Sequence, residues 1–139
     1  MTDLAGISLL IIDDEEEFAQ TLASRLELRD MRVRVACDGE EGLRAIAENL
    51  PAVLLLDMRM PGLSGVEVLR RIREGQIPGA EHLPVIIVSG HASVTDARSA
   101  QELGISGYVP KPVQFDDLLE AIRAACAEES SGWAPGGTP

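Results

Sequence analysis

Asp57 is the side chain in this sequence with the clearest potential for chemistry. It closes an apolar run, residues 52–56, and Pro61-Gly62 follows shortly after it. An apolar run of this length, bounded by turn residues, predicts a buried strand of a parallel sheet. A carboxylate fits such a strand only at its C-terminal end, where open α/β sheets have their ligand crevices. There it is a candidate nucleophile, because a carboxylate can accept a phosphoryl group. Taken alone, Asp57 also fits a solvated residue that opens a turn.

Four more polar side chains follow or end other predicted strands. Asp13 and Asp14 follow the first strand, Ser89 ends the fourth, and Lys111 follows the fifth. Each has an ordinary explanation by itself, as a helix cap, a turn or a surface residue. Parallel strands end at one edge of their sheet, so we expect all four near Asp57. Lys111 is also the only lysine in a chain with eleven arginines.

Together these side chains predict a site for a divalent cation and a phosphoryl group. Two like charges about 4 Å apart, at an effective dielectric constant of about 20, repel by about 4 kcal/mol. Three crowded carboxylates therefore need a counter-charge, or one of them keeps its proton. Mg²⁺ prefers oxygen ligands and also binds phosphate oxygens. Lys111 offers a positive charge to a phosphate oxygen, and Ser89 offers a hydroxyl donor.

The elements that must position these residues alternate strictly between strand and helix. Apolar patterns predict strands over residues 7–12, 32–35, 52–57, 84–89 and 107–110, each followed by an amphipathic helix. Such alternation with short connections predicts an α/β fold with a parallel sheet and helices on both faces. For a doubly wound (βα)5 chain we expect the flavodoxin-like strand order 2-1-3-4-5, taken from known folds of this kind rather than from the residues.

Polar residues before the apolar helical faces predict where four helices begin. Asp38 with Glu41 and Ser64 with Glu67 have the spacing of a capping box. The weaker pair Ser93 with Asp96 predicts a fourth helix, ending at Gly104, and Asp116 or Asp117 is expected to start the last one. The predicted buried positions of the second and last helices are Leu43, Ile46 and Ala47, and Leu118, Leu119, Ile122 and Ala125.

Length and composition indicate one domain with a short extension. The 139 residues suit a single core, which we place at residues 4–128. Residues 129–139 are rich in Gly, Pro and Ser and predict a flexible tail or the start of a linker. Cys37 and Cys126 lie far apart and match no metal spacing, which favours free buried thiols in a reducing cytosol.

Charge and hydropathy exclude several classes of partner. The formal net charge is −11, which argues against direct nucleic-acid binding by this segment. No apolar stretch approaches the roughly 20 residues of a membrane span, and the N-terminus has no signal-peptide pattern. We therefore expect a cytoplasmic protein that meets other proteins or a cation, without membrane association.

The polar segments at the strand ends resemble those of response-regulator receiver domains. The resemblance spans roughly residues 4–127 and is carried by Ile11-Ile12-Asp13-Asp14-Glu15, by the stretch from Leu56 to Gly65, by Val88-Ser89-Gly90 and by Gly107-Tyr108-Val109-Pro110-Lys111-Pro112. It implies that Asp57 is the phosphoacceptor. It also implies the remaining roles: Asp13, Asp14, Asp57 and the Arg59 carbonyl as Mg²⁺ ligands, Lys111 as the phosphate-binding lysine, Ser89 as the switch hydroxyl and Tyr108 as the rotameric aromatic residue.

The resemblance implies a signalling switch in a two-component or phosphorelay system. A sensor histidine kinase or a histidine phosphotransfer protein would donate a phosphoryl group from phosphohistidine. The change would be read by a downstream output domain or protein, at the face of the fourth helix, fifth strand and fifth helix. Such a domain is no enzyme beyond its own phosphorylation and dephosphorylation. We also hypothesise that Arg59 and His91, two residues past Asp57 and Ser89, control water access to the acyl phosphate.

Other classes fit less well. A hydrolase of the haloacid dehalogenase type needs a second Asp two residues after the first, where this chain has Arg59. An FMN binder needs a Ser/Thr/Gly-rich phosphate loop after the first strand, but residues 13–17 are all acidic. The Gly-x-Gly-x-x-Gly pattern of dinucleotide oxidoreductases is missing there. The alternative that stays open is an interaction module of the same fold that acts without phosphorylation.

Overall fold

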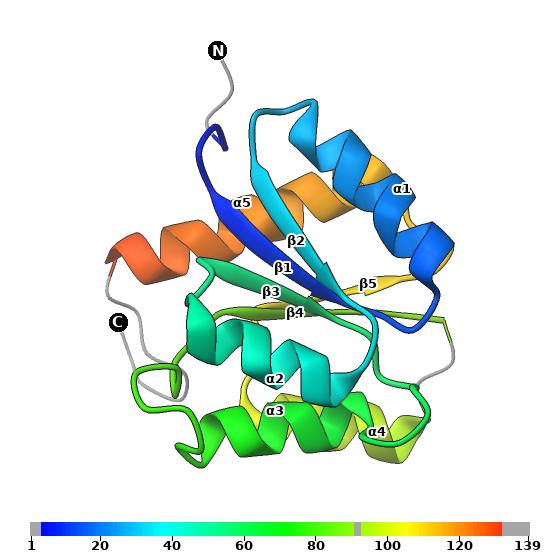
Figure 1. Cartoon of the computed structure of the whole chain (residues 1–139), viewed down its shortest axis with the longest axis vertical. Coiled ribbons are helices and arrows are strands. Elements are labelled where there is room, and N and C mark those ends of the chain that lie inside the picture. Colours follow the sequence, from blue (N-terminus) through cyan, green and yellow to red (C-terminus); the bar gives the residue numbers. More distant parts are fainter. Residues whose placement is uncertain (1–3, 91–92, 132–139) are drawn as a thin grey trace.

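A five-stranded parallel sheet forms the centre of the molecule (Figure 1). The computed structural model describes residues 4–90 and 93–131. The sheet order is β2-β1-β3-β4-β5, which confirms the predicted flavodoxin-like α/β architecture. The elements in chain order are β1 (Ser8–Ile12), α1 (Glu16–Glu27), β2 (Arg32–Ala36), α2 (Gly39–Glu48), β3 (Val53–Leu56), α3 (Gly65–Arg73), β4 (Val85–Ser89), α4 (Val94–Leu103), β5 (Gly107–Pro110) and α5 (Phe115–Ser131).

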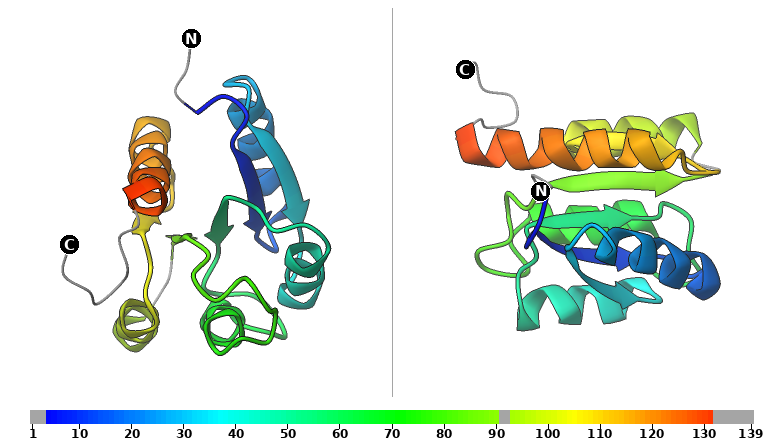
Figure 2. Two further views of the ribbon diagram at one scale, coloured as in Figure 1. Left: turned by 90° about the vertical axis from the view of Figure 1, so that its left-hand side faces the viewer. Right: turned by 90° about the horizontal axis from the view of Figure 1, so that it is seen from above.

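Helices cover both faces of the sheet and enclose two apolar clusters. Figure 2 shows α1 and α5 on one face and α2, α3 and α4 on the other. Successive strand residues point to opposite faces, so Leu10 and Ile12 of β1 join one cluster while Leu9 and Ile11 join the other. All residues of β3 and β4 are buried. Each fully buried aliphatic side chain contributes about 1.5–3 kcal/mol, so these central strands hold the sheet edge firmly in place.

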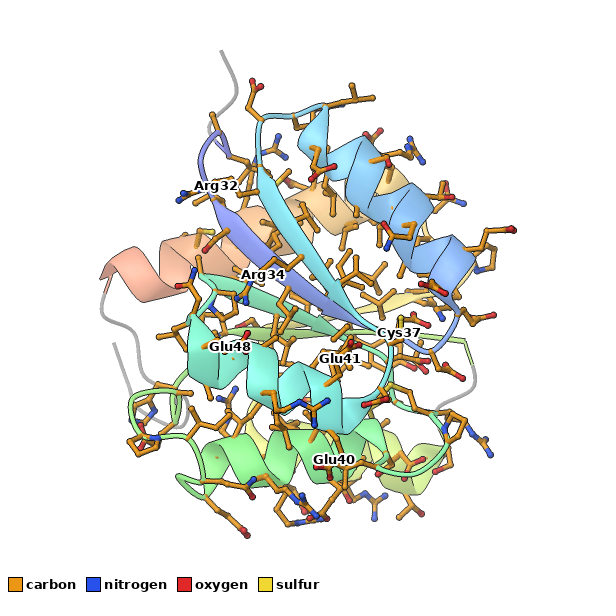
Figure 3. All side chains as sticks on the ribbon, in the orientation of Figure 1. Arg32, Arg34, Cys37, Glu40, Glu41 and Glu48 are labelled. Carbon is orange, nitrogen blue, oxygen red and sulfur yellow. The ribbon has the colours of Figure 1, made fainter. Side chains whose placement is uncertain are left out.

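The predicted caps start α2, α3 and α4. Asp38 accepts a hydrogen bond from the Glu41 N–H at 2.8 Å. The Glu41 carboxylate, beside Cys37 in Figure 3, accepts from the Cys37 N–H at 2.5 Å. The Ser64 and Ser93 hydroxyls accept from backbone N–H groups three residues ahead, at 3.2 and 3.0 Å respectively.

Glu67 departs from the capping-box prediction. Its carboxylate forms ion pairs with Arg70 at 2.8 Å and Arg71 at 3.2 Å, one turn further along α3. The arginines at these helical spacings therefore draw the side chain away from the start of the helix. The predicted C-terminal end of α4 is confirmed. Gly104 follows the last residue of this helix and has a positive φ of 96°, as expected of a helix-terminating glycine.

The last helix differs from the prediction at both ends. It begins at Phe115 and continues to Ser131. Asp116 and Asp117 lie in its first turn, where carboxylates are favoured by the helix dipole without being caps. At its C-terminal end the helix extends three residues into the predicted tail, because no Gly or Pro interrupts the chain before Gly132. The remainder of that tail, residues 132–139, lies outside the described residues.

Three side chains are more exposed than predicted. Cys37 and Cys126 form no disulfide within the described part of the chain and are only half-buried, since Cys37 follows the edge strand β2 and Cys126 lies at the margin of its cluster. Ala47 is exposed because it is rotated by about 100° from its buried neighbour Ile46 around α2. In the part of the chain that the structure describes, no helix has the length and apolar character needed to cross a bilayer.

Candidate functional site

The carboxyl edge of the sheet brings the predicted polar residues together. Ligand oxygens of Asp13, Asp14 and Asp57 all lie within 4.8 Å of one another. Lys111 Nζ is 2.9 Å from Asp13 Oδ2 and 3.9 Å from Asp57 Oδ2. Ser89 lines the same cavity as Asp14, Asp57 and Lys111. The predicted juxtaposition of these five side chains is therefore present in the fold.

Sheet hydrogen bonds fix the backbone of this group. The Asp13 N–H donates to the Ala36 carbonyl at 3.1 Å, and the Asp57 N–H donates to the Ile12 carbonyl at 3.0 Å. The Lys111 N–H donates to the Ser89 carbonyl at 3.2 Å. Because these bonds continue the strand ladders by one residue, the side chains are held on rigid elements rather than on loops.

A cavity of about 820 Å³ opens beside the acidic group. Its lining combines polar residues at the strand ends with residues of α1 and of the segment after β5. The lining residues are Asp14, Glu15, Phe18, Thr21, Leu22, Arg25, Asp57, Arg59, Ser89, Gly90, Lys111, Pro112 and Val113. The cavity is large enough for a phosphoryl group and part of its donor, since ligand sites commonly have about 300–1,000 Å³.

Burial and mutual repulsion raise the pKa values of two carboxyl groups in this cluster. Asp57 is only 5% exposed. Burial, followed by the charge of Asp13, raises the pKa of Asp57 to about 6, although the Lys111 charge and the Arg59 N–H act in the opposite direction. Burial also raises the pKa of Asp13 despite its hydrogen bond from Lys111. A bound cation would offset the repulsion between the carboxylates and the cost of burying their charge, so these oxygen ligands fit a hard cation such as Mg²⁺.

Lys111 has two partners that sequence reasoning missed. Its Nζ lies 2.6 Å from Glu15 Oε1 and 4.5 Å from the centre of the Phe18 ring. Burial by itself would lower the pKa of Lys111, but the hydrogen bonds to Glu15 and Asp13 outweigh it and the pKa is raised. Glu15 is the residue that precedes α1 and Phe18 lies in the first turn of that helix, but nothing in the sequence pairs Glu15 with a lysine 96 residues away.

The two predicted switch residues differ sharply in burial. Ser89 is 1% exposed, whereas Tyr108 on β5 is 40% exposed. Within the described residues, the Ser89 hydroxyl has no hydrogen-bond partner of good geometry, although it is near enough to Asp57 to help lower the pKa of that carboxyl. Arg59 is exposed and lines the cavity. His91 lies outside the described residues, so the hypothesis about its role stays a prediction.

Gly65 is a further residue that shapes the site. A Cβ atom there would collide with the carbonyl oxygen of Asp57 and would lie 2.7 Å from the Cα of Met58. The Gly65 N–H also donates to the Met58 carbonyl at 2.9 Å. The start of α3 therefore packs directly on the chain that leaves Asp57. The only signal in the sequence is a glycine directly after the cap Ser64.

The fold and the polar group at its edge define a class of protein, the receiver domains. Comparison with family models agrees, because residues 9–123 match the response regulator receiver domain. The chain belongs to this family of two-component signalling proteins. Receiver domains of the family act as signalling switches rather than as classical enzymes, and response regulators interact with histidine kinases and downstream effectors.

Curated relatives are longer than this chain. The uncharacterized transcriptional regulatory protein YkoG of Bacillus subtilis is 38% identical over 123 residues, which cover 88% of this chain and 52% of the relative. The transcriptional regulatory protein KdpE of Mycobacterium tuberculosis is 37% identical over 117 residues, covering 84% and 50% respectively. The chain thus spans about half the length of the curated relatives it matches.

Solved structures match nearly along their whole length. A response regulator receiver domain protein from Clostridium thermocellum has 36% identity and a TM-score of 0.81, covering 89% of this chain and 97% of that one. A CheY-like receiver domain protein from Methanospirillum hungatei has 26% identity and a TM-score of 0.84, covering 92% and 99%.

Proposed function

We propose that Asp57 accepts a phosphoryl group from a phosphohistidine of a sensor histidine kinase or histidine phosphotransfer protein. The observation that carries the proposal is the placement of Asp57, buried at a strand end, within 4.8 Å of two carboxylates and 3.9 Å from an ammonium group. An Asp57 carboxylate oxygen attacks phosphorus of a phosphohistidine whose other ring nitrogen carries a proton, the P–N bond breaks, and the imidazole leaves as the neutral base that keeps this proton. The product is an acyl phosphate on Asp57.

The surrounding residues supply charge and positioning for this transfer. Mg²⁺ held by Asp13, Asp14, Asp57 and the Arg59 carbonyl would neutralise charge on the transferring group. Asp57 must be ionised to attack. Without a cation its pKa is about 6, so the fraction of reactive carboxylate falls as the pH drops from neutral through 6. Lys111 would meet one phosphoryl oxygen and Ser89 another, each as a hydrogen-bond donor.

The acyl phosphate would act as a signal through Ser89 and Tyr108. The buried Ser89 hydroxyl gains an acceptor in the phosphoryl oxygen, and its movement leaves space for the Tyr108 ring. Helix α4 is held weakly, since Ala100 is its only buried residue and Val94 is 78% exposed. Only contacts that differ between the two states shift the balance. The altered α4–β5–α5 face would be read by a downstream output domain or protein in the cytoplasm.

The proposal is tested by phosphorylation with acetyl phosphate and Mg²⁺, followed by intact mass measurement. Wild-type protein should gain one phosphoryl group, Asp57→Asn should gain none, and Asp117→Asn, an exposed carboxylate on α5, should behave as wild type. Labelling that persists in Asp57→Asn, or no labelling of the wild type, would contradict the mechanism. In the second case the alternative, an interaction module that works without phosphorylation, becomes the better description.

A further inference from the structure

Helix α1 lacks the side-chain cap that begins α2, α3 and α4. Helices α2, α3 and α4 are capped by Asp38, Ser64 and Ser93, and each of these side chains accepts a hydrogen bond from a backbone N–H three residues ahead. The corresponding residue of α1 is Glu15, and its side chain makes no cap hydrogen bond. Its carboxylate instead reaches Lys111 Nζ at 2.6 Å. A side-chain cap normally stabilises a helix start, so the orientation of Glu15 follows the lysine rather than the helix.

Glu15 and Phe18 form a seat for the Lys111 ammonium group. The ammonium group has three N–H donors. Asp13 at 2.9 Å and Glu15 at 2.6 Å take two of them, and the Phe18 ring lies 4.5 Å away. Asp57 Oδ2, at 3.9 Å, is beyond hydrogen-bond distance. The lysine is therefore held by its contacts with Asp13 and α1, and not by the residue at which the phosphoryl group would appear.

We propose that Glu15 is a positioning residue that holds Lys111 in this seat and competes with the phosphoryl group for its ammonium charge. The inference rests on the proposed role of Asp57 as phosphoacceptor. Once Asp13 is engaged by a cation, Glu15 remains as the carboxylate partner of Lys111. A phosphoryl oxygen on Asp57 draws the ammonium group away from Glu15, so each of these two partners weakens the contact of the other with Lys111. Glu15 thereby sets how strongly the site holds a phosphoryl group.

The size of the effect follows from exposure. The Lys111 side chain is 15% exposed, but that of Glu15 is 63% exposed. An ion pair with one exposed partner is screened by salt and contributes little. Loss of the Glu15 charge should therefore strengthen binding of a phosphoryl analogue about two- to fivefold at low salt. The gain should shrink as ionic strength rises.

Two measurements test the proposal. In the metal-free protein, a double-mutant cycle of Glu15→Gln and Lys111→Met should give a favourable coupling in unfolding free energy, because the two side chains form an ion pair in the wild type. With Mg²⁺ present, calorimetric titration with beryllium trifluoride, a phosphoryl analogue, should show tighter binding to Glu15→Gln than to wild type. Glu17→Gln removes an equal charge from the same exposed turn and is the matched control.

The outcomes separate the inference from the proposed function. Zero coupling in the cycle, equal or weaker analogue binding by Glu15→Gln, or the same gain in Glu17→Gln would overturn competition by Glu15. Glu15→Ser, which restores a side chain able to cap α1, should repeat the gain and guards against a loss of stability in the amide variant. If wild-type protein does not bind the analogue, both the proposed function and the competition by Glu15 are overturned. If wild-type protein binds it, the comparison with the variants tests only the competition by Glu15.

Discussion

Substituting Asp57 by Asn should stabilise the metal-free protein at neutral pH, although it removes the proposed phosphoacceptor. The pKa of Asp57 is raised from 3.8 to about 6, with burial the largest cause and the Asp13 charge the second. The folded protein thus binds this proton more tightly than the unfolded chain. The stability that the wild-type protein gains from binding this proton is fully present below the unfolded pKa of 3.8 and is lost as the pH rises through about 6, so the advantage of Asn grows with pH.

The magnitude follows from the size of the shift. About two pKa units at about 1.4 kcal/mol each place the penalty of ionised Asp57 near 3 kcal/mol at about pH 8. At about pH 5 roughly half of this penalty remains, because the folded carboxyl is then mostly protonated while the unfolded one is not. Asn cannot ionise, so Asp57→Asn should be more stable than wild type by these amounts, taken as upper limits.

Urea unfolding in the presence of a metal chelator, at both pH values, measures the difference. Asp117→Asn makes the same chemical change at an exposed position of α5 and should shift stability by no more than about 0.5 kcal/mol. Mg²⁺ should stabilise the wild type more than Asp57→Asn and so reduce the difference between them. A metal-free Asp57→Asn protein that is no more stable than wild type at the higher pH would refute the reasoning.

Three further substitutions test how the surroundings support the site. Gly65→Ala should destabilise the protein by about 1–3 kcal/mol in urea unfolding, because its Cβ collides with the Asp57 carbonyl, and should slow phosphorylation by acetyl phosphate; unchanged values in both assays would contradict the packing argument. Arg73 donates hydrogen bonds to the carbonyls of Glu81, Leu103 and Gly104 at 2.8–3.1 Å. Arg73→Met should therefore lower the free energy of unfolding by about 1–3 kcal/mol and speed amide hydrogen exchange in α4. Exchange rates equal to those of the wild type would argue against an anchoring role of Arg73. Ser89→Ala should still accept a phosphoryl group by intact mass, but the α4–β5–α5 face should no longer respond in NMR spectra, and an undiminished response would remove Ser89 from the switch.

The fold was predictable because its signals are local and repeated. Apolar runs at β1, β3 and β4 and the polar caps before α2, α3 and α4 can each be read within a few residues. Strict alternation then predicts a parallel sheet, and a parallel sheet places Asp13, Asp57, Ser89 and Lys111 at one edge. The strand order itself came from known folds, since residue patterns do not say which strands are neighbours.

The identities and order of the site residues were therefore determined by the sequence, whereas their energies were decided by the tertiary structure. The pKa of Asp57 depends on how deeply the strand end is buried and how near Asp13 lies, and neither quantity is local. Gly65 is required only because α3 packs against the chain after Asp57. Lys111 and Glu15 are 96 residues apart in the sequence and form an ion pair only because the start of α1 and the end of β5 lie side by side in the assembled sheet.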